Sequence, residues 1–257
     1  MKILRDIGYA NDSSASHMGD MFLPDDSSEL HPIALCIHGG GWRTMDRRSF
    51  EGVAEFMQSQ GFAAFNIEYR LLGEAPWPAC GDDCLLAAKF LLEGNDGLKE
   101  LKRDKLFIIG ASAGGHLALM TGLRLPSRQV SGIVSISGVC DLEAKDPDPH
   151  FQFRPSVFWN EERLFSKAEI NAASPAGIVK AGQPPVLCTH CPIDNVVGIV
   201  HSRNFVARSK ELGAKAELFE YNRPLDGHCI WIPGSNPHKL FPEIEAAIAR
   251  FAKAVAC

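Results

Sequence analysis

Short apolar runs and longer mixed segments alternate along the chain. The apolar runs hold few polar residues and are rich in Val, Ile, Leu and Phe, so they lack a polar face. Runs of this kind predict strands of a parallel sheet that is covered on both faces. The predicted strands are residues 33–37, 62–67, 106–109, 133–136, 186–188 and 216–221.

The segments between these runs predict helices, because their apolar residues recur at helical spacing. Two of the segments are followed by Gly61 and Gly213, and glycine is a common residue just past the end of a helix. Residues 3–9 and 17–23 predict an antiparallel hairpin ahead of the first parallel strand. The predicted helices are residues 48–60, 82–92, 113–123, 201–212 and 243–255.

The alternation of strands and helices predicts an α/β fold. We expect a mostly parallel central sheet with helices on both faces and right-handed crossovers. The sequence shows no linker and no internal repeat, so we expect a single domain over residues 1–257.

Residues 141–173 interrupt this rhythm. The segment is too long for a plain connection, and it is rich in aromatic residues, which a disordered loop would not hold. One interpretation is a short cap-like excursion over the strand ends that lines a pocket. The other is an ordinary crossover whose aromatic side chains belong to the core.

Composition and charge exclude several classes of protein. The chain has 257 residues, 46% of them hydrophobic, and a formal net charge of −5, as expected of a globular domain. With 26 Lys and Arg against 31 Asp and Glu and no basic run, nucleic-acid binding has no electrostatic support. No run approaches the roughly 18 apolar residues of a membrane helix. Residues 1–10 lack the apolar core of a signal peptide, so we expect a cytoplasmic protein without a membrane partner.

The eight cysteines raise the question of a metal or disulfide set. Most of them lie in or beside apolar runs, where cysteine behaves as a small hydrophobic residue. Cys188 and Cys191 have C-x-x-C spacing, but the second half of a zinc site is absent. Cys80 and Cys84 fall on one face of a predicted helix. We therefore expect packing residues and no metal.

A G-x-S-x-G motif at residues 110–114 marks a candidate nucleophile, Ser112. The motif follows a predicted strand and begins a predicted helix, which is the setting of a nucleophile elbow. Such a turn holds the serine in a strained backbone conformation and requires tiny residues two positions before and after it. The adjacent helix N-terminus favours negative charge beside the hydroxyl.

A serine nucleophile needs a base and a partner that orients the base. In α/β folds with a nucleophile elbow, the nucleophile comes first along the chain, the acid second and the histidine last. Asp194 follows the predicted strand 186–188, and His228 follows the predicted strand 216–221. All three residues therefore fall past the carboxyl ends of strands, at the edge where α/β sheets bind their ligands.

Three successive glycines in the run HGGGW, residues 38–42, indicate an oxyanion hole. Backbone N–H groups of glycines can turn toward one point without interference from side chains. The alternative is a phosphate-binding loop. However, the frames G-x-x-x-x-G-K-[ST] and G-x-G-x-x-G are both absent.

In combination, these motifs resemble α/β-hydrolases of the hormone-sensitive-lipase-like group, especially its acetyl-esterase and feruloyl-esterase-like members. The resemblance implies that Ser112 attacks an acyl carbonyl, that His228 transfers the proton, and that Asp194 orients His228. It implies no cofactor. The matching stretches are residues 38–42, 69–71, 76–79, 110–116, 174–175, 184–186, 194–197 and 227–228.

The same resemblance extends to the surroundings of the nucleophile. It implies an oxyanion hole formed by the N–H groups of Gly40, Gly41 and Ala113. Trp42 and Trp159 are the candidate aromatic residues that line the substrate pocket.

We therefore expect a serine carboxylesterase that acts on short acyl esters, including acetylated sugars. The HGGxW pattern also resembles the signature of kynurenine formamidase, an aryl-formamide hydrolase. A feruloyl or acetylxylan-type esterase is a third reading. A binding protein on an inactive hydrolase scaffold would lack a triad residue, whereas here all three are present. The partner is then a small ester, and the oligomeric state, with a homodimer as one option, stays open.

Overall fold

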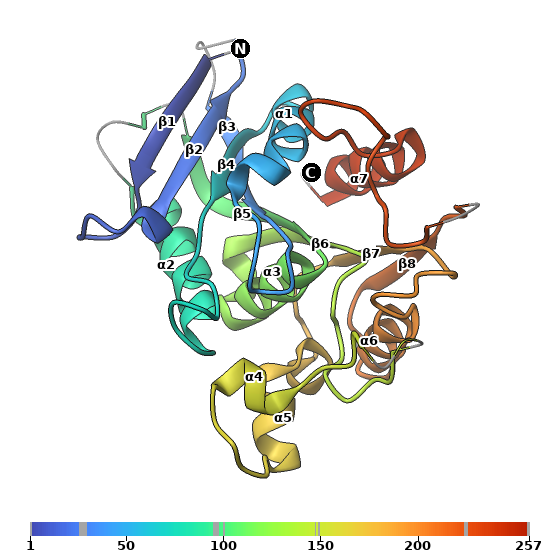
Figure 1. Ribbon diagram of the computed structural model, residues 1–257. Coiled ribbons are helices and arrows are strands. Elements are labelled where there is room, and N and C mark those ends of the chain that lie inside the picture. Colours follow the sequence, from blue (N-terminus) through green and yellow to red (C-terminus); the bar gives the residue numbers. More distant parts are fainter. Residues whose placement is uncertain are drawn as a thin grey trace.

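The centre of the fold is one mixed sheet, shown in Figure 1. The computed structural model describes residues 2–25, 30–94, 98–99, 101–146, 148, 150–223 and 226–255. Within these residues, eight strands pair in the order β1-β2-β4-β3-β5-β6-β7-β8. Their bounds are β1 (Lys2–Gly8), β2 (Met18–Leu23), β3 (His31–Ile37), β4 (Ala63–Ile67), β5 (Leu101–Ala111), β6 (Val130–Ile136), β7 (Val186–His190) and β8 (Ala216–Glu220).

The pairing confirms the predicted α/β architecture. β1 pairs with β2, and β2 with β4, in antiparallel fashion, as the predicted hairpin requires. From β4 to β8 every pairing is parallel. The carboxyl ends of the parallel strands therefore meet at one edge of the sheet, where the candidate site residues were expected.

Helices cover both faces of the sheet. α2, α3 and α6 supply residues to one hydrophobic cluster, and α1 and α7 to the other. The helices are α1 (Glu51–Ser59), α2 (Ala79–Glu93), α3 (Ala113–Arg124), α4 (Pro155–Trp159), α5 (Lys167–Ala173), α6 (Val200–Glu211) and α7 (Pro242–Val255). Among the described residues, none of these helices is long and apolar enough to cross a membrane.

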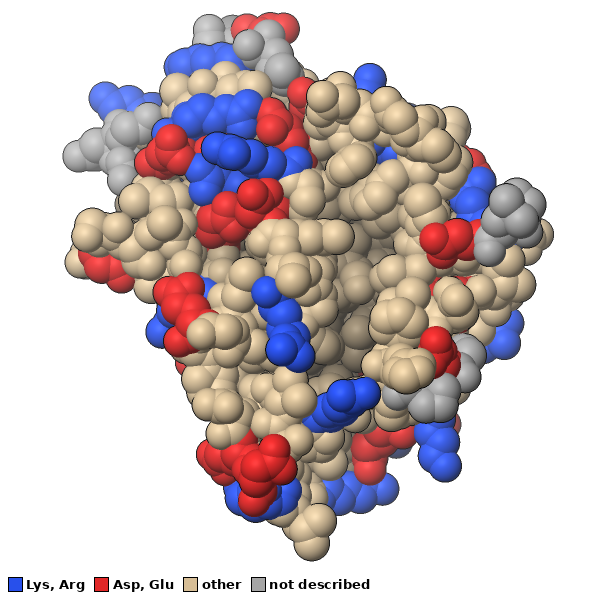
Figure 2. All heavy atoms as spheres, in the orientation of Figure 1, with Lys and Arg blue, Asp and Glu red and all other residues tan. Residues whose placement is uncertain are grey.

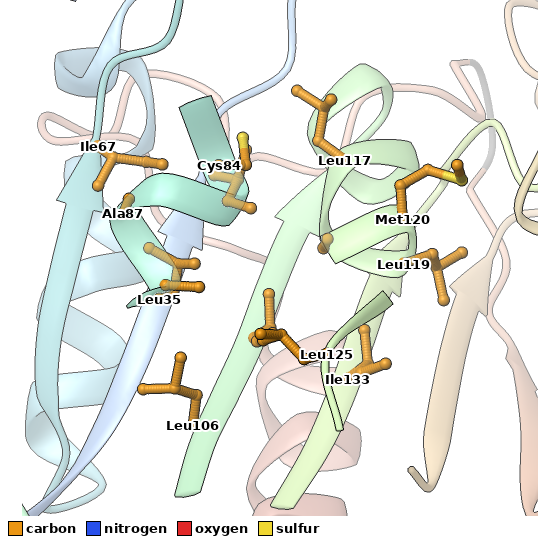
Figure 3. Packing of buried hydrophobic residues seen from close by; sticks show 14 of the residues in the cluster. Leu35, Ile67, Cys84, Ala87, Leu106, Leu117, Leu119, Met120, Leu125 and Ile133 are labelled. Atoms are coloured by element: carbon orange, nitrogen blue, oxygen red, sulfur yellow. The ribbon is translucent and has the colours of Figure 1, made fainter. Parts of the chain in front are cut away.

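The strands divide their side chains between the two clusters with a period of two. In β3, Leu35 and Ile37 belong to the cluster under α2 and α3, whereas Ala34 and Cys36 belong to the other. Both sets are buried, which is why the run shows no polar face in the sequence. Figure 3 shows the first cluster, where Leu35 lies below α2 and Ile133 below α3.

The same alternation separates the C-x-x-C cysteines. Cys188 lies in the cluster on the α3 side of the sheet and Cys191 in the cluster on the α7 side. Two thiols on opposite faces cannot bind one metal ion. The seven cysteines within the described residues are free thiols, and six of them are buried; Cys257 lies outside the described residues.

Strand β5 begins five residues earlier than predicted. Its first half, residues 101–105, is buried only at Leu101 and is mostly exposed beyond it, whereas the second half is a continuous buried run. This first half pairs with the start of β3 across a register irregularity between Pro32 and Ile33. A strand end that extends beyond the covering helices is solvated on one face, so a search for continuous apolar runs misses it.

The excursion at residues 141–173 contains α4 and α5, and its residues 147 and 149 lie outside the described residues. Both interpretations of this segment hold in part. Phe158 is buried and stacks on Trp77 of the main domain, with ring centroids 4.9 Å apart. Phe151 is 49% exposed and lines the cavity beside Ser112.

A buried carboxylate fastens the loop after β4 to helix α2. The side chain of Asp83 is 2% exposed and accepts two-pronged hydrogen bonds from the Arg70 guanidinium, at 2.6 to 3.1 Å. Asp83 also accepts the backbone N–H of Arg70 at 2.9 Å and contacts His17 Nε2 at 3.1 Å. This geometry makes Arg70 a structural ion-pair residue.

Replacement of this carboxylate should therefore destabilise the fold. We expect Asp83→Ala to lower the free energy of unfolding by about 3–5 kcal/mol, because it leaves a partly buried guanidinium without its partner. The melting temperature should fall by roughly 10 °C. Glu211→Ala, which removes the exposed Arg208–Glu211 pair, is the control and should change the stability by less than about 0.5 kcal/mol. Equal melting temperatures for the two variants would contradict this account.

Candidate active site

Ser112 lies at the sharp turn between β5 and α3, in a strained conformation with φ 54° and ψ −120°. The two flanking glycines explain why the turn is possible. A Cβ atom on Gly110 would lie 2.1 Å from the carbonyl oxygen of Gly114, and one on Gly114 would lie 2.2 Å from that of Ile37. The strand and the helix therefore approach each other only because these positions carry no side chain.

The structure brings His228 and Asp194 to Ser112. The Nε2 atom of His228 lies 3.2 Å from the Ser112 hydroxyl oxygen, and its Nδ1 atom lies 2.7 Å from Oδ2 of Asp194. The three residues are separated by up to 116 positions in the chain. Their predicted meeting at one edge of the sheet is thus what the geometry shows.

The Asp194 carboxylate is buried but well supplied with hydrogen bonds. Its Oδ1 atom accepts the backbone N–H groups of Val196 and Val197, each at 2.9 Å. Burial alone would raise the pKa of Asp194, but hydrogen bonds from His190 and His228 outweigh it and hold the pKa well below its usual range. Asp194 therefore stays ionised over the whole pH range in which proteins are normally studied.

A second histidine, His190, supports this carboxylate. Its Nε2 atom lies 2.8 Å from the carbonyl oxygen of Val197, so Nε2 carries the proton, and it lies 3.4 Å from Asp194. Nδ1 then accepts a hydrogen bond from the Ser202 hydroxyl at 2.8 Å. No motif in the sequence indicates this role of His190.

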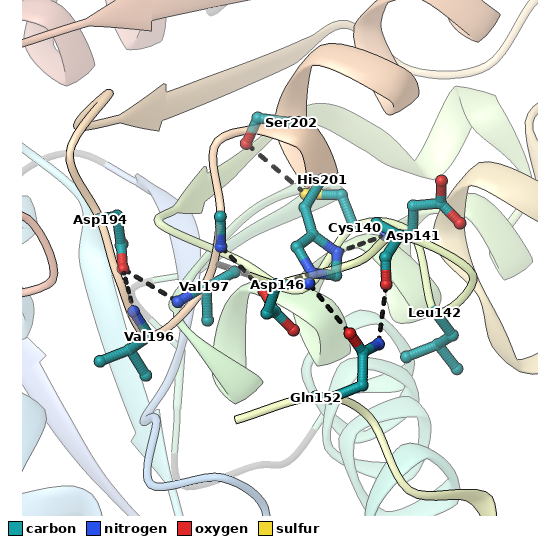
Figure 4. A network of polar contacts seen from close by, with 12 residues as sticks. Cys140, Asp141, Leu142, Asp146, Gln152, Asp194, Val196, Val197, His201 and Ser202 are labelled. Carbon is teal, nitrogen blue, oxygen red and sulfur yellow. Dashed lines mark hydrogen bonds and ion pairs between the residues drawn. The ribbon is translucent and has the colours of Figure 1, made fainter. Parts of the chain in front are cut away.

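A polar network joins the loop of Asp194 to the excursion, as Figure 4 shows. The Oδ1 atom of Asp146 accepts the N–H of Gly198 at 2.9 Å and lies 3.1 Å from Nε2 of His201. His201 is buried, and its Nδ1 atom accepts the backbone N–H of Asp141. The excursion and the loop therefore share one set of hydrogen bonds, although the sequence showed no partner for His201.

The glycine run after β3 forms a tight loop beside Ser112. Gly40 and Gly41 have φ values of 102° and 59°, a region that side chains rarely tolerate. The carbonyl of Gly40 accepts the N–H groups of Arg43 and Thr44, both at 3.0 Å. The Tyr69 hydroxyl lies 3.0 Å and 3.2 Å from the carbonyls of residues 38 and 39, which fixes the start of the loop.

A cavity of about 450 Å³ opens above Ser112. Gly40, Gly41 and Ala113, whose N–H groups are the candidate oxyanion donors, all line it. Most of its other walls are apolar or aromatic, which favours the binding of a small organic substrate. These walls include Trp42, Met45, Phe50, Val139, Phe151, Val197, Ile230 and Trp231.

The two tryptophans that were predicted to line the pocket, Trp42 and Trp159, lie in different surroundings. Trp42 lines the cavity, and its indole N–H donates to Nδ1 of His116 at 3.3 Å. Trp159 lies outside the lining of this cavity. It packs instead against Phe158 and stacks on Phe165, with ring centroids 5.0 and 4.7 Å apart. The role predicted for Trp159 at the pocket therefore stays a prediction, because aromatic content does not distinguish an aromatic cluster in the excursion from a pocket wall.

Trp231 and His238 also line the cavity, and their rings stack with centroids 5.8 Å apart. Neither was predicted. Their segment follows His228 and has no periodic pattern, so nothing in the sequence assigned it to a wall of the cavity.

Within the described ranges, no group of three or more His, Cys, Asp or Glu residues is placed to hold a metal ion.

The sheet order, the strained serine turn and the residues gathered beside it define the class of an α/β-hydrolase. The BD-FAE family model matches residues 19–208. The chain therefore belongs to the BD-FAE family of α/β-hydrolases.

Three of the curated relatives match the chain at 25 to 32% identity. The matching part of a non-reducing polyketide synthase (ascC) of Acremonium egyptiacum is 32% identical over 161 residues, 59% of this chain and 7% of that protein. Esterase LipC of Mycobacterium tuberculosis is 25% identical over 77% of this chain and 52% of its own length. The probable carboxylic ester hydrolase LipM of the same organism is 25% identical over 90% and 57%. The chain thus spans about half the length of the two esterases.

Solved structures of esterases share the fold. A truncated carbohydrate esterase from gut microbiota superposes with a TM-score of 0.75 at 23% identity, over 86% of this chain and 88% of the other. An acetyl ester-xyloside bifunctional hydrolase from Caldicellulosiruptor lactoaceticus superposes with a TM-score of 0.78 at 19% identity, over 98% and 96%. At these identities the likeness concerns the fold alone.

The contact between Trp42 and His116 generates a prediction about pH. His116 donates from Nε2 to the carbonyl of Ala173 at 2.8 Å, and burial lowers its pKa from 6.5 to about 4. The unfolded chain therefore binds a proton at this histidine near pH 6.5, whereas the folded chain binds it only near pH 4. Above pH 6.5 both states leave His116 neutral, and its titration does not affect stability. As the pH falls from 6.5 to 4, the free energy of unfolding decreases by about 3 kcal/mol in total.

We expect melting curves to show this loss. The melting temperature of the wild type should fall more steeply between pH 6.5 and 4 than that of His116→Gln, which has no titrating group at this position. The comparison isolates His116, because all other titrating groups are common to both proteins. Parallel curves would show that His116 titrates normally in the folded state.

Proposed function

We propose that the protein is a serine carboxylesterase that hydrolyses short-chain acyl esters through Ser112, His228 and Asp194. The observation that carries this proposal is the position of His228, which is within hydrogen-bond distance of both the Ser112 hydroxyl and the Asp194 carboxylate. This arrangement is the geometric mark of an activated serine nucleophile.

In the acylation step, the Ser112 hydroxyl oxygen attacks the ester carbonyl carbon while Nε2 of His228 takes the hydroxyl proton. The ionised Asp194 keeps the proton of His228 on Nδ1 and stabilises the imidazolium that forms. The carbonyl oxygen becomes an oxyanion, which we propose is bound by the N–H groups of Gly40, Gly41 and Ala113, three residues that line the cavity. The imidazolium then donates its Nε2 proton to the leaving alcohol, and the acyl group remains on Ser112.

The deacylation step repeats this chemistry with water. Water loses a proton to His228 as its oxygen attacks the acyl carbon, and His228 returns the proton to Ser112 as the carboxylic acid leaves. Each oxyanion donor of this type is worth roughly 3 kcal/mol in the transition state. The rigid turns at the glycine loop and at Ser112 support the proposal, because such donors act best when they are already oriented.

The cavity supports short acyl groups. Its volume of about 450 Å³ must hold both the acyl part and the beginning of the alcohol part, and Phe50, Ile230 and Trp231 narrow it. The printed names of the structural neighbours point in the same direction, since they include a carbohydrate esterase and an acetyl ester-xyloside hydrolase. We therefore propose acetylated sugars as one substrate class.

Removal of the nucleophile tests the reaction. We expect wild-type protein to hydrolyse p-nitrophenyl acetate, and Ser112→Ala to reduce kcat by at least about 10⁴-fold, because the variant has no atom that can carry the acyl group. Ser49→Ala is the matched control, since Ser49 lines the same cavity and its hydroxyl bonds only to the carbonyl of Asp46. The proposal fails if the wild type hydrolyses no ester, or if both variants have the wild-type rate.

A series of acyl chains tests the substrate class. The value of kcat/KM should be highest for p-nitrophenyl acetate or butyrate and lower for the octanoate, because we propose that the apolar and aromatic walls around Ser112 leave room only for a short acyl chain. N-formylkynurenine in the same assay tests the aryl-formamide alternative. A steady rise of kcat/KM up to the octanoate would contradict the short-chain proposal.

A further inference from the structure

A second cavity adjoins the one above Ser112. It has a volume of about 260 Å³ and shares three lining residues with the serine cavity, namely Gly41, Trp42 and Phe151. It lies between the glycine loop and the excursion, and it is lined mainly by residues 150–158 of the excursion. A substrate whose ester carbonyl lies at Ser112 can therefore place another part of its structure in this second cavity.

Two of the polar residues that line this second cavity are cations, namely Arg43 and Arg154. The other polar residues of its lining are His150 and Gln152, and no carboxylate among the described residues lines it. In the part of the chain that the structure describes, neither arginine side chain forms an ion pair or a hydrogen bond. Each guanidinium therefore has its N–H donors free for a ligand.

Nearby carboxylates do not neutralise the two arginines. Arg43 also borders a surface groove that contains Glu68 and Glu74, but Glu68 pairs with Arg47, and Glu74 accepts a hydrogen bond from the Ser16 hydroxyl. Asp148 lies beside the cavity, and its Oδ1 atom accepts the backbone N–H of His150 at 2.9 Å. Within the described residues, none of these carboxylates forms an ion pair with Arg43 or Arg154, and none of them lines the cavity itself.

The remaining walls are apolar and aromatic. The Phe158 ring lies 5.2 Å from those of Trp42 and Phe153, measured between centroids. Leu72 and Val157 complete the apolar walls. Apolar walls suit a ring or a short chain, and they lower the local dielectric constant, which strengthens attraction between an arginine and an anion. Figure 2 shows the hollow on this face of the molecule, with mostly tan walls and Lys or Arg side chains near its lower left rim.

We propose that this second cavity is a subsite for a carboxylate group, carried on an aromatic or short aliphatic part of the ester substrate. Arg43 and Arg154 would bind the carboxylate, because guanidinium groups match its two oxygens. The proposal rests on the proposed esterase function and adds a substrate class to it, namely esters that bear a negative charge. The carboxylate can belong to the alcohol part or to the acyl part, since both begin at the same carbonyl.

Two pairs of esters distinguish a carboxylate on the alcohol part from one on the acyl part. For the alcohol part, 4-acetoxybenzoate is compared with neutral 4-acetoxybenzamide. For the acyl part, the p-nitrophenyl monoester of glutaric acid is compared with its neutral methyl ester. In each pair the measured quantity is the ratio of kcat/KM for the anionic ester to that for the neutral ester, so intrinsic reactivity cancels between protein variants.

We expect the double variant Arg43→Gln/Arg154→Gln to lower this ratio about tenfold for one of the two pairs, as expected for loss of a hydrogen-bonded charge partner. Added salt should lower the wild-type ratio as well. Arg128→Gln is the matched control, because Arg128 is exposed and lines a cavity at the opposite edge of the sheet. The pair that responds identifies whether the acyl or the alcohol part carries the charge.

A binding measurement separates this proposal from the proposed function. Titration calorimetry with Ser112→Ala should show tighter binding of 4-acetoxybenzoate or the glutarate monoester than of its neutral partner, and the preference should disappear in the triple variant with both arginines replaced. If no ester is hydrolysed but this preference is present, the esterase function is wrong and the anion subsite stands. If esters are hydrolysed but neither ratio nor binding depends on the two arginines, the subsite is overturned.

Discussion

The close approach of helix α3 to strand β5 is the constraint on which the rest of the site depends. Gly110 and Gly114 nearly touch through backbone atoms, and this contact forces Ser112 into a conformation that costs energy in isolation. The strain persists because the sheet and α3 are both buried in the core and cannot separate. Ser112, the proposed nucleophile, is thus held by packing, and the other residues of the site meet it at a fixed point.

Electrostatics and hydrogen bonds fix the position of Asp194, the proposed acid of the site. A buried carboxylate is costly unless its oxygens are satisfied, and Asp194 meets this condition with two backbone N–H groups and two histidines. His190 in turn is held by Ser202 of α6, and the loop after Asp194 is tied to the excursion through Asp146. The excursion therefore does more than cover the strand ends, because it helps to keep the acid loop in its place.

The sequence predicted the fold well, and it pointed to three residues that the structure places together, because both leave strong local signals. Continuous apolar runs follow from burial on two faces, and the spacing of Gly110, Ser112 and Gly114 follows from the elbow. The roles of His190 and His201 were not predictable, since their partners come from loops whose paths leave no pattern in the sequence. Trp159 illustrates a related limit, because composition indicates that an aromatic residue packs against others but not which wall it joins.

This division between predictable and unpredictable parts has a physical basis. The groups proposed to carry the reaction sit on strand ends and at the start of a buried helix, where packing leaves few alternatives. The residues that shape the two cavities, such as Arg43, Phe151, Arg154 and Trp231, lie on loops or beside short helices of the excursion. Loops can change without disturbing the sheet, so the same reaction can be directed to new esters there. The choice of substrate should therefore be sought in the loops, where the two exposed arginines are the clearest chemical feature.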